Sequence, residues 1–188
     1  MEAKEILDKL METGALLEGH FLLRSGLHSN RYFQAAQVLQ YTKIAEQMCR
    51  ELAAKFADDE VDTVISPAVG GIVVGQEVGR ALGVRAIFAE KDGQGGLVLR
   101  RGFSMQPGER VLVAEDVITR GGRVQQTIDL VRATGAEVAG VAVLVDRSGG
   151  GAALAVRPKS LIELELAVYS PDECPMCGEG IELVKPGS

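Results

Sequence analysis

The apolar positions of this chain follow two spacings, and each spacing predicts one kind of element. Short runs in which almost every residue is apolar suit strands that are buried on both faces of a sheet. We predict six such strands, at residues 61–66, 84–89, 96–101, 111–114, 138–145 and 161–166.

Apolar residues at helical spacing predict helices between and before these strands. We predict helices at residues 3–12, ending before Gly14, from Thr42 as N-cap to about Phe56, at 70–82 and at 123–134. This alternation predicts an α/β fold with a mainly parallel central sheet, helices on both faces and right-handed crossover connections. Such sheets bind ligands beyond the carboxyl ends of their strands.

The length and composition fit one compact domain, and the net charge limits its possible partners. The chain has 188 residues, 46% of them hydrophobic, enough to bury a sizeable core. Its net charge of −6 argues against a nucleic-acid partner, because phosphate backbones bind to basic faces. The first residues predict an amphipathic helix rather than a signal peptide, and no apolar run is long enough for a bilayer. We expect a cytoplasmic protein with one domain over residues 1–188 and no membrane partner.

The segment 111–122 carries the most specific chemistry in the chain. After an apolar strand it presents Glu115 and Asp116, whose carboxylates can accept hydrogen bonds from vicinal ribose hydroxyls and attract a metal cation. The amides of residues 118–122 would face outward at the start of a helix, where free N–H groups and the helix dipole favour a phosphate. The segment therefore predicts a sugar-phosphate site, whereas a lone Glu-Asp pair would more often be a solvated turn.

Three loops at other strand ends are candidates to complete this site. Gly70 and Gly71 could hold a second anion on their amides, although a tight strand-helix turn is equally consistent. Loop 90–96 is polar and glycine-rich, as a mobile lid would be, and its Lys91 could stabilise a departing anion or simply be solvated. Arg147, after the strand 138–145, could pair with a carboxylate or lie in a surface turn.

The cysteines give no sign of a disulfide framework, which suits a reducing compartment. Cys49 lies in a helical pattern and is predicted to be a buried thiol. Cys174 and Cys177 have the spacing of half a zinc site, but a tetrahedral site needs four ligands and no second pair of cysteines exists. We therefore predict a surface turn without metal ligands there. The alternatives are a reactive dithiol and a structural metal, whose most plausible form bridges two chains.

The composite pattern of segment 111–122, with four apolar residues, two acids, two apolar residues, Thr and Gly-Gly, resembles the phosphoribosyl diphosphate (PRPP) signature of type I phosphoribosyltransferases. Segment 19–33, Gly-His-Phe-Leu-Leu-Arg-Ser-Gly-Leu-His-Ser-Asn-Arg-Tyr-Phe, is similar to the base-binding hood of orotate phosphoribosyltransferases. The diphosphate loop, the Glu-Lys lid and Asp-Arg-Ser-Gly-Gly follow in the same order. The Cys-Pro-x-Cys tail within 168–188 resembles the short-lid bacterial form, so the resemblance covers nearly the whole chain.

This resemblance implies the type I phosphoribosyltransferase fold, with residues 1–40 contributing the hood. It implies transfer of the phosphoribosyl group from PRPP to orotate in de novo pyrimidine (UMP) synthesis, giving orotidine 5′-phosphate and diphosphate. Magnesium would be chelated by PRPP, and the protein would be a homodimer with active sites shared across its interface.

The resemblance also implies roles for individual residues. Lys91, Glu115 and Asp116 would be catalytic, with both acids on the ribose hydroxyls and Lys91 entering the neighbouring subunit's site. PRPP would contact these three residues and the loop Val117, Ile118, Thr119, Arg120, Gly121, Gly122 and Arg123. Orotate would contact Arg24, Tyr32, Phe33, Thr119 and Arg147.

Departures from the enteric form of the family leave alternatives open. The lid is shorter and lacks additional Lys, Arg and His residues. The diphosphate loop has Val69-Gly70 in place of an aromatic residue and Lys, so Arg85 or a backbone amide could substitute. His20 and His28 match no catalytic position, which favours a role within the hood or on the surface. A phosphoribosyltransferase for another base, or a PRPP-sensing regulator, is the alternative function, although the acidic charge argues against a DNA-binding regulator.

Overall fold

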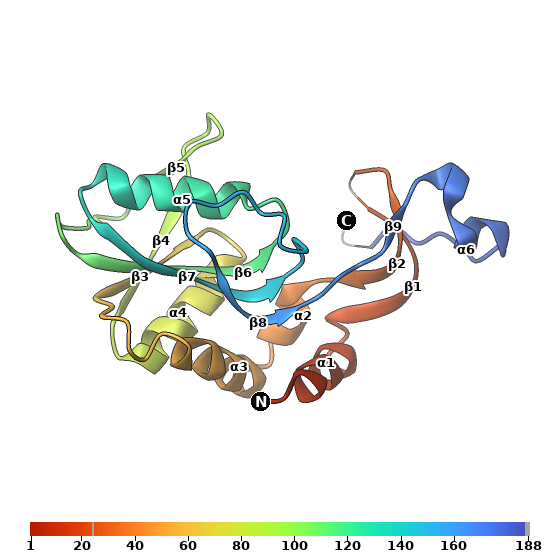
Figure 1. The fold of residues 1–188 in the computed structure, drawn as a ribbon, viewed down its shortest axis with the longest axis horizontal. Helices are drawn as coiled ribbons and strands as arrows, with labels where there is room; N and C mark the ends of the chain where they lie inside the picture. Colours follow the sequence, from red (N-terminus) through yellow and green to blue (C-terminus); the bar gives the residue numbers. More distant parts are fainter. Residues whose placement is uncertain (24, 187–188) are drawn as a thin grey trace. The chain divides into compact units, whose positions relative to one another are not determined.

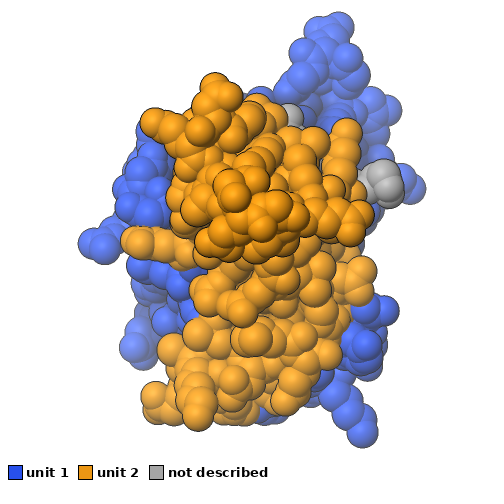
Figure 2. All heavy atoms as spheres, turned by 90° about the vertical axis from the view of Figure 1, so that its right-hand side faces the viewer, with its two compact units in different colours: residues 1, 39–164 blue, residues 2–38, 165–188 orange. Residues whose placement is uncertain are grey.

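The computed structural model describes residues 1–23 and 25–186, and the chain divides into two compact units (Figures 1 and 2). Unit 1 consists of Met1 and Leu39–Leu164, and unit 2 consists of Glu2–Val38 and Glu165–Ser188. The predicted hood and the C-terminal tail thus belong to the same unit. No helix in the described part of the chain is both long and apolar enough to cross a membrane.

Unit 1 is built on a six-stranded sheet of order β5-β4-β3-β6-β7-β8. Adjacent strands are parallel except for β5, which pairs antiparallel with β4 at one edge. The strands are β3 (Thr63–Pro67), β4 (Arg85–Lys91), β5 (Leu97–Leu99), β6 (Arg110–Ile118), β7 (Glu137–Asp146) and β8 (Lys159–Glu163).

Helices cover both faces of this sheet, as the sequence predicts for strands that are apolar on both sides. Helix α5 (Gly122–Ala133) packs on one face, and α3 (Thr42–Ala54) and α4 (Gly71–Leu82) pack on the other (Figure 1). The core between α5 and the sheet includes Val113 and Val143 from central strands, both fully buried. This arrangement confirms the predicted α/β fold class.

The predicted elements of unit 1 match the structure to within a few residues, with three instructive differences. Strand β6 continues to Ile118, so Glu115 and Asp116 lie within the strand rather than after it. Most of the predicted lid belongs to a hairpin formed by β4 and β5. Thr42 is the first residue of α3, and Tyr41 takes the N-cap position without a side-chain cap.

Unit 2 joins the two ends of the chain in one small sheet. Strands β1 (Leu16–Leu22), β2 (His28–Phe33) and β9 (Val168–Tyr169) form an antiparallel sheet in the order β1-β2-β9. The remaining elements of the chain are α1 (Ala3–Glu12), α2 (Ala35–Leu39), a 3-10 turn η1 (Pro171–Glu173) and α6 (Pro175–Gly178). Helix α1 was predicted correctly, whereas no strand was predicted where β1 and β2 form their hairpin.

Candidate active site

A cavity of about 580 Å³ opens in unit 1 where the carboxyl ends of β3, β4 and β6 meet α5. All ten residues predicted to contact PRPP line it, although they come from two separate segments of the sequence. The lining residues are Pro67, Ala68, Gly70, Lys91, Glu115, Asp116, Val117, Ile118, Thr119, Arg120, Gly121, Gly122, Arg123, Val124 and Gln126. The cavity thus lies where ligands of parallel sheets bind.

Two adjacent carboxylates from β6 face this cavity. Glu115 is only 7% exposed, and one of its carboxylate oxygens accepts a hydrogen bond from the Asp116 amide at 3.2 Å. The Val117 amide donates to Asp116 Oδ1 at 2.7 Å. Burial, and after it the charge of the neighbouring Asp116, raises the pKa of Glu115 to about 9. A ligand that brings hydroxyl donors or positive charge would stabilise the ionised form of these two carboxylates.

The turn between β6 and α5 presents backbone donors to the same cavity. Gly121 occupies the N-cap of α5 with φ +81°, and a methyl group there would lie 2.9 Å from Leu154 Cδ2. Only glycine suits both the left-handed backbone and the close contact. No side chain in the described structure caps this helix, so its first amides remain open to an anion. Opposite the turn, the Arg147 amide donates to the Ile118 carbonyl at 2.8 Å.

The loop after β3 lies directly against the two carboxylates. A methyl group at Gly70 would lie 2.5 Å from Asp116 Oδ2, and one at Gly71 would lie 2.8 Å from Glu115 Oε1. The peptide bond between Ala68 and Val69 is cis. Glycine at positions 70 and 71 therefore lets the loop approach the acids, and its backbone can face the cavity.

Arg85 cannot replace the missing loop lysine. It lies at the amino end of β4, whereas the cavity lies at the carboxyl ends of the strands. Its guanidinium donates to Thr63 Oγ1 at 2.7 Å, to the Ser104 carbonyl at 2.6 Å and to Glu109 Oε1 at 2.8 Å. The Arg85 alternative is wrong, and backbone amides are the remaining substitute.

Hydrogen bonds within the turn between β4 and β5, and from this turn to α5, hold the hairpin in place. Asp92 Oδ1 accepts hydrogen bonds from the amides of Gln94 at 2.7 Å and Gly96 at 3.0 Å. The Gly95 carbonyl accepts from Arg123 Nη1 at 3.4 Å and from Gln126 Nε2 at 3.1 Å. The predicted lid is thus attached to α5, the helix whose N-terminus faces the cavity.

Sequence reasoning missed Gln126, which lines the cavity and also accepts a hydrogen bond from Arg123 Nη1 at 2.8 Å. The available signal was its position on α5, one helical turn after Arg123 and therefore on the same face. Pro67 and Ala68 also line the cavity; they belong to the loop that the sequence predicted for a second anion, although only its glycines were singled out.

Comparison with known proteins identifies the family. A family model described as phosphoribosyl transferase domain matches residues 37–173. The orotate phosphoribosyltransferase of Pelotomaculum thermopropionicum is 56% identical over 188 residues, covering 100% of this chain and 98% of the relative. The chain belongs to the orotate phosphoribosyltransferase family. A second orotate phosphoribosyltransferase, from Desulforamulus reducens, is 54% identical with the same coverage.

Solved structures agree with this family. The orotate phosphoribosyltransferase from Aeropyrum pernix has a TM-score of 0.70 at 28% identity and covers 87% of this chain and 94% of its own. The adenine phosphoribosyltransferase from Thermoanaerobacter pseudethanolicus, at 20% identity and a TM-score of 0.61, shares the fold.

The residues that the orotate phosphoribosyltransferase family pattern assigns to the base are divided between the units. Thr119 is exposed beside the cavity of unit 1, and Arg147 is half-buried just after β7. In unit 2, Phe33 is 5% exposed and Tyr32 packs against Phe21, with ring centroids 5.9 Å apart. The fifth residue, Arg24, lies outside the described residues.

Proposed function

We propose that this protein transfers the phosphoribosyl group of PRPP to orotate, yielding orotidine 5′-phosphate and diphosphate for UMP synthesis. The observation that carries the proposal is the cavity in which Glu115, Asp116 and the open N-terminus of α5 lie together. Full-length identity above 50% to orotate phosphoribosyltransferases supports orotate as the acceptor.

In this proposal the chain recognises PRPP through three kinds of group. Glu115 and Asp116 accept hydrogen bonds from the ribose hydroxyls, and the amides of residues 118–123 surround the 5′-phosphate. Lys91 stabilises charge on the diphosphate as its bond to ribose C1 breaks. Electrostatic stabilisation then matters more than a dedicated base, because positive charge develops on the sugar and negative charge on the leaving group.

The two carboxylates also fit a magnesium ion carried by PRPP. Glu115 is buried next to Asp116, and hard divalent cations prefer carboxylate oxygens and phosphate oxygens as ligands. When bound, magnesium would supply positive charge to the diphosphate. The contribution of Glu115 and Asp116 is to hold the ribose end of that complex in place.

Orotate carries its own negative charge, which calls for cationic partners. We assign Arg147 and Arg24 to its carboxylate or ring oxygens, with Thr119 as a hydrogen-bond partner and Tyr32 and Phe33 over the ring. An arginine built to pair with a carboxylate disfavours uracil, because the guanidinium would then be left without its partner.

The deciding experiment follows orotate by ultraviolet absorbance in the presence of the purified protein, PRPP and magnesium. Parallel reactions contain uracil, hypoxanthine or adenine in place of orotate. Consumption of orotate alone supports the proposal. Consumption of another base would assign the protein to that base, and PRPP binding without any turnover would support a PRPP-sensing regulator.

We further propose a cytoplasmic homodimer in which Lys91 serves the neighbouring subunit. Lys91 lines the cavity of its own chain, so both arrangements need a direct test. Lys91→Ala and Asp116→Ala, each expected to be inactive alone, are mixed and allowed to exchange subunits. Recovered activity supports action across the interface, because one site then keeps both residues. No recovery, with exchange verified by mass-tagged subunits, would place Lys91 in its own chain's site.

A further inference from the structure

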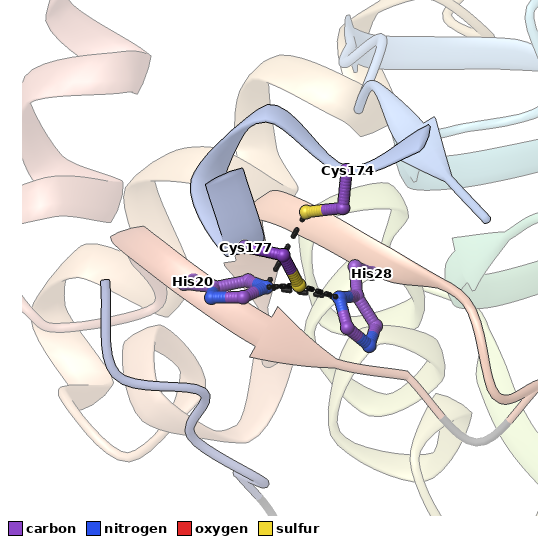
Figure 3. Close-up of side chains that lie close together, drawn as sticks. All are labelled: His20, His28, Cys174 and Cys177. Carbon is purple, nitrogen blue, oxygen red and sulfur yellow. Dashed lines mark hydrogen bonds between the residues drawn. The ribbon is translucent and has the colours of Figure 1, made fainter. Parts of the chain in front are cut away.

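Four potential metal ligands from both ends of the chain converge in unit 2 (Figure 3). They are His20, His28, Cys174 and Cys177, and their nearest ligand atoms all lie within 4.8 Å of one another. His20 is 2% exposed, His28 5% and Cys174 5%, while Cys177 is exposed at the surface. The proposed transfer reaction uses none of these side chains.

The spacing of the four atoms is that of a tetrahedral zinc site. Zn–N bonds of about 2.0–2.1 Å and Zn–S bonds of about 2.3 Å imply N···N, N···S and S···S separations of roughly 3.3, 3.6 and 3.8 Å. His20 Nε2 lies 2.9 Å from His28 Nδ1 and 3.4 Å from Cys174 Sγ. Cys177 Sγ lies 3.7 Å from His20 Nε2 and 3.3 Å from His28 Nδ1. The two remaining separations lie within 4.8 Å, so shifts between a few tenths of an ångström and about 1 Å would bring all six to these values.

The ligands come from the hairpin of β1 and β2 and from the short helix α6. His28 pairs with Leu22 across the hairpin, and His20 lies two residues before Leu22, within the irregularity of β1 between Glu18 and Phe21. Cys174 and Cys177 lie at the N-cap and the third residue of α6. This Cys-x-x-Cys turn has the ligand spacing found in structural zinc sites.

A backbone carbonyl orients the first histidine for metal binding. His20 Nδ1 lies 2.9 Å from the Ile181 carbonyl, which can only accept a hydrogen bond, so Nδ1 carries the proton. The lone pair of Nε2 therefore faces the cluster. Ligation by one ring nitrogen with the other donating to a carbonyl is the usual arrangement for metal-bound histidine.

Hydrogen bonding alone does not account well for this cluster. The single lone pair of His20 Nε2 faces three groups, His28 Nδ1, Cys174 Sγ and Cys177 Sγ, and can accept from only one of them at full strength. A central cation would instead use every lone pair at once. Two thiolates would neutralise the charge of a divalent ion.

We propose that His20, His28, Cys174 and Cys177 bind one structural Zn²⁺ that fastens the C-terminal tail to the hairpin of β1 and β2. Four protein ligands close the coordination sphere, which is the mark of a structural rather than a catalytic zinc. The prediction of a turn without metal ligands overlooked the histidines, which supply the second pair of ligands. Unit 2 is small, and units of this size gain stability from a metal cross-link.

The test measures zinc in the full-length protein, purified under reducing conditions without chelator from cells grown with added zinc. We expect about one zinc per chain. Cys174→Ser and Cys177→Ser should each lower the zinc content at least tenfold, whereas Cys49→Ala, which removes the buried thiol of α3, should keep it. Cys177 is exposed, so its substitution leaves packing largely intact and separates ligand loss from misfolding.

Cobalt gives a second readout that does not depend on variants. Wild-type protein stripped of metal and titrated with Co²⁺ should show tetrahedral d–d absorption and a thiolate charge-transfer band, both saturating at one equivalent. Zinc below a tenth of an equivalent in reduced, zinc-treated wild type would overturn the proposal. Full zinc retention in Cys174→Ser/Cys177→Ser would also overturn it. Neither readout involves orotate, so the zinc site and the transferase activity succeed or fail separately.

Discussion

Replacing Glu115 with glutamine should make the ligand-free protein more stable at neutral pH while impairing catalysis. Glutamine keeps the size of the side chain and removes its charge. In the native protein, burial raises the pKa of Glu115 from 4.5 to about 9, so folding favours the protonated form. The stability supplied by that preference is complete below pH 4.5 and is lost as pH rises towards 9.

The size of the effect follows from the same shift. Each pH unit above the unfolded-state pKa of 4.5 costs about 1.36 kcal/mol while the native group stays protonated, which amounts to at most about 3.4 kcal/mol at pH 7. Relaxation around the carboxylate lowers this value, so we expect a gain on the order of 1–3 kcal/mol for Glu115→Gln. The amide is a poorer partner for ribose hydroxyls, and kcat/KM for PRPP should fall at least tenfold.

Urea denaturation of wild type and Glu115→Gln between pH 5 and pH 9 measures this directly, with no PRPP or magnesium present. The gap between the two free energies of unfolding should widen as pH rises, with unchanged m values. Glu12→Gln, at an exposed position of α1, is the matched control and should change stability by less than about 0.5 kcal/mol. A variant no more stable than wild type at pH 7, with a parallel pH profile, would refute the reasoning.

Three further substitutions test the base site, the phosphate turn and the core. Arg147→Ala should raise KM for orotate by roughly 10–100-fold, which corresponds to the loss of one hydrogen bond between charged groups, and should change KM for PRPP far less. Equal effects on both constants would contradict the assignment of Arg147 to orotate. Gly121→Ala should raise KM for PRPP at least several-fold, because φ is +81° and Leu154 blocks the new methyl; unchanged steady-state kinetics would contradict this. Gly140→Ala places a methyl 2.7 Å from Phe56 Cε1. It should lower the free energy of unfolding, measured by urea denaturation, by about 1–3 kcal/mol without altering KM for either substrate.

The sequence predicted unit 1 well because its central strands are buried on both faces. Strands β3, β6 and β7 consist mainly of apolar residues, and glycines mark both ends of α4 and the start of α5. The burial of Glu115 was not visible in this pattern. Glu115 is buried because the loop after β3 lies against β6. A contact between segments far apart in the sequence produces no local pattern from which it could be predicted.

Unit 2 was predicted poorly because its buried positions are partly polar. His28 and Ser29 are buried in β2, where Ser29 Oγ donates to the Ala167 carbonyl at 2.7 Å. Such satisfied polar residues break the alternation that marks a strand. The cluster of His20 with Cys174 joins residues 154 positions apart, so no local motif could reveal it.

The attachment of the lid to α5 has a consequence for the order of events in turnover. Arg123 holds the Gly95 carbonyl from the turn that would receive the 5′-phosphate. A phosphate that draws the guanidinium towards itself would leave Gln126 as the remaining tether between that helix and the Gly95 carbonyl. Binding of the sugar donor would then weaken, without removing, the attachment of the lid to α5.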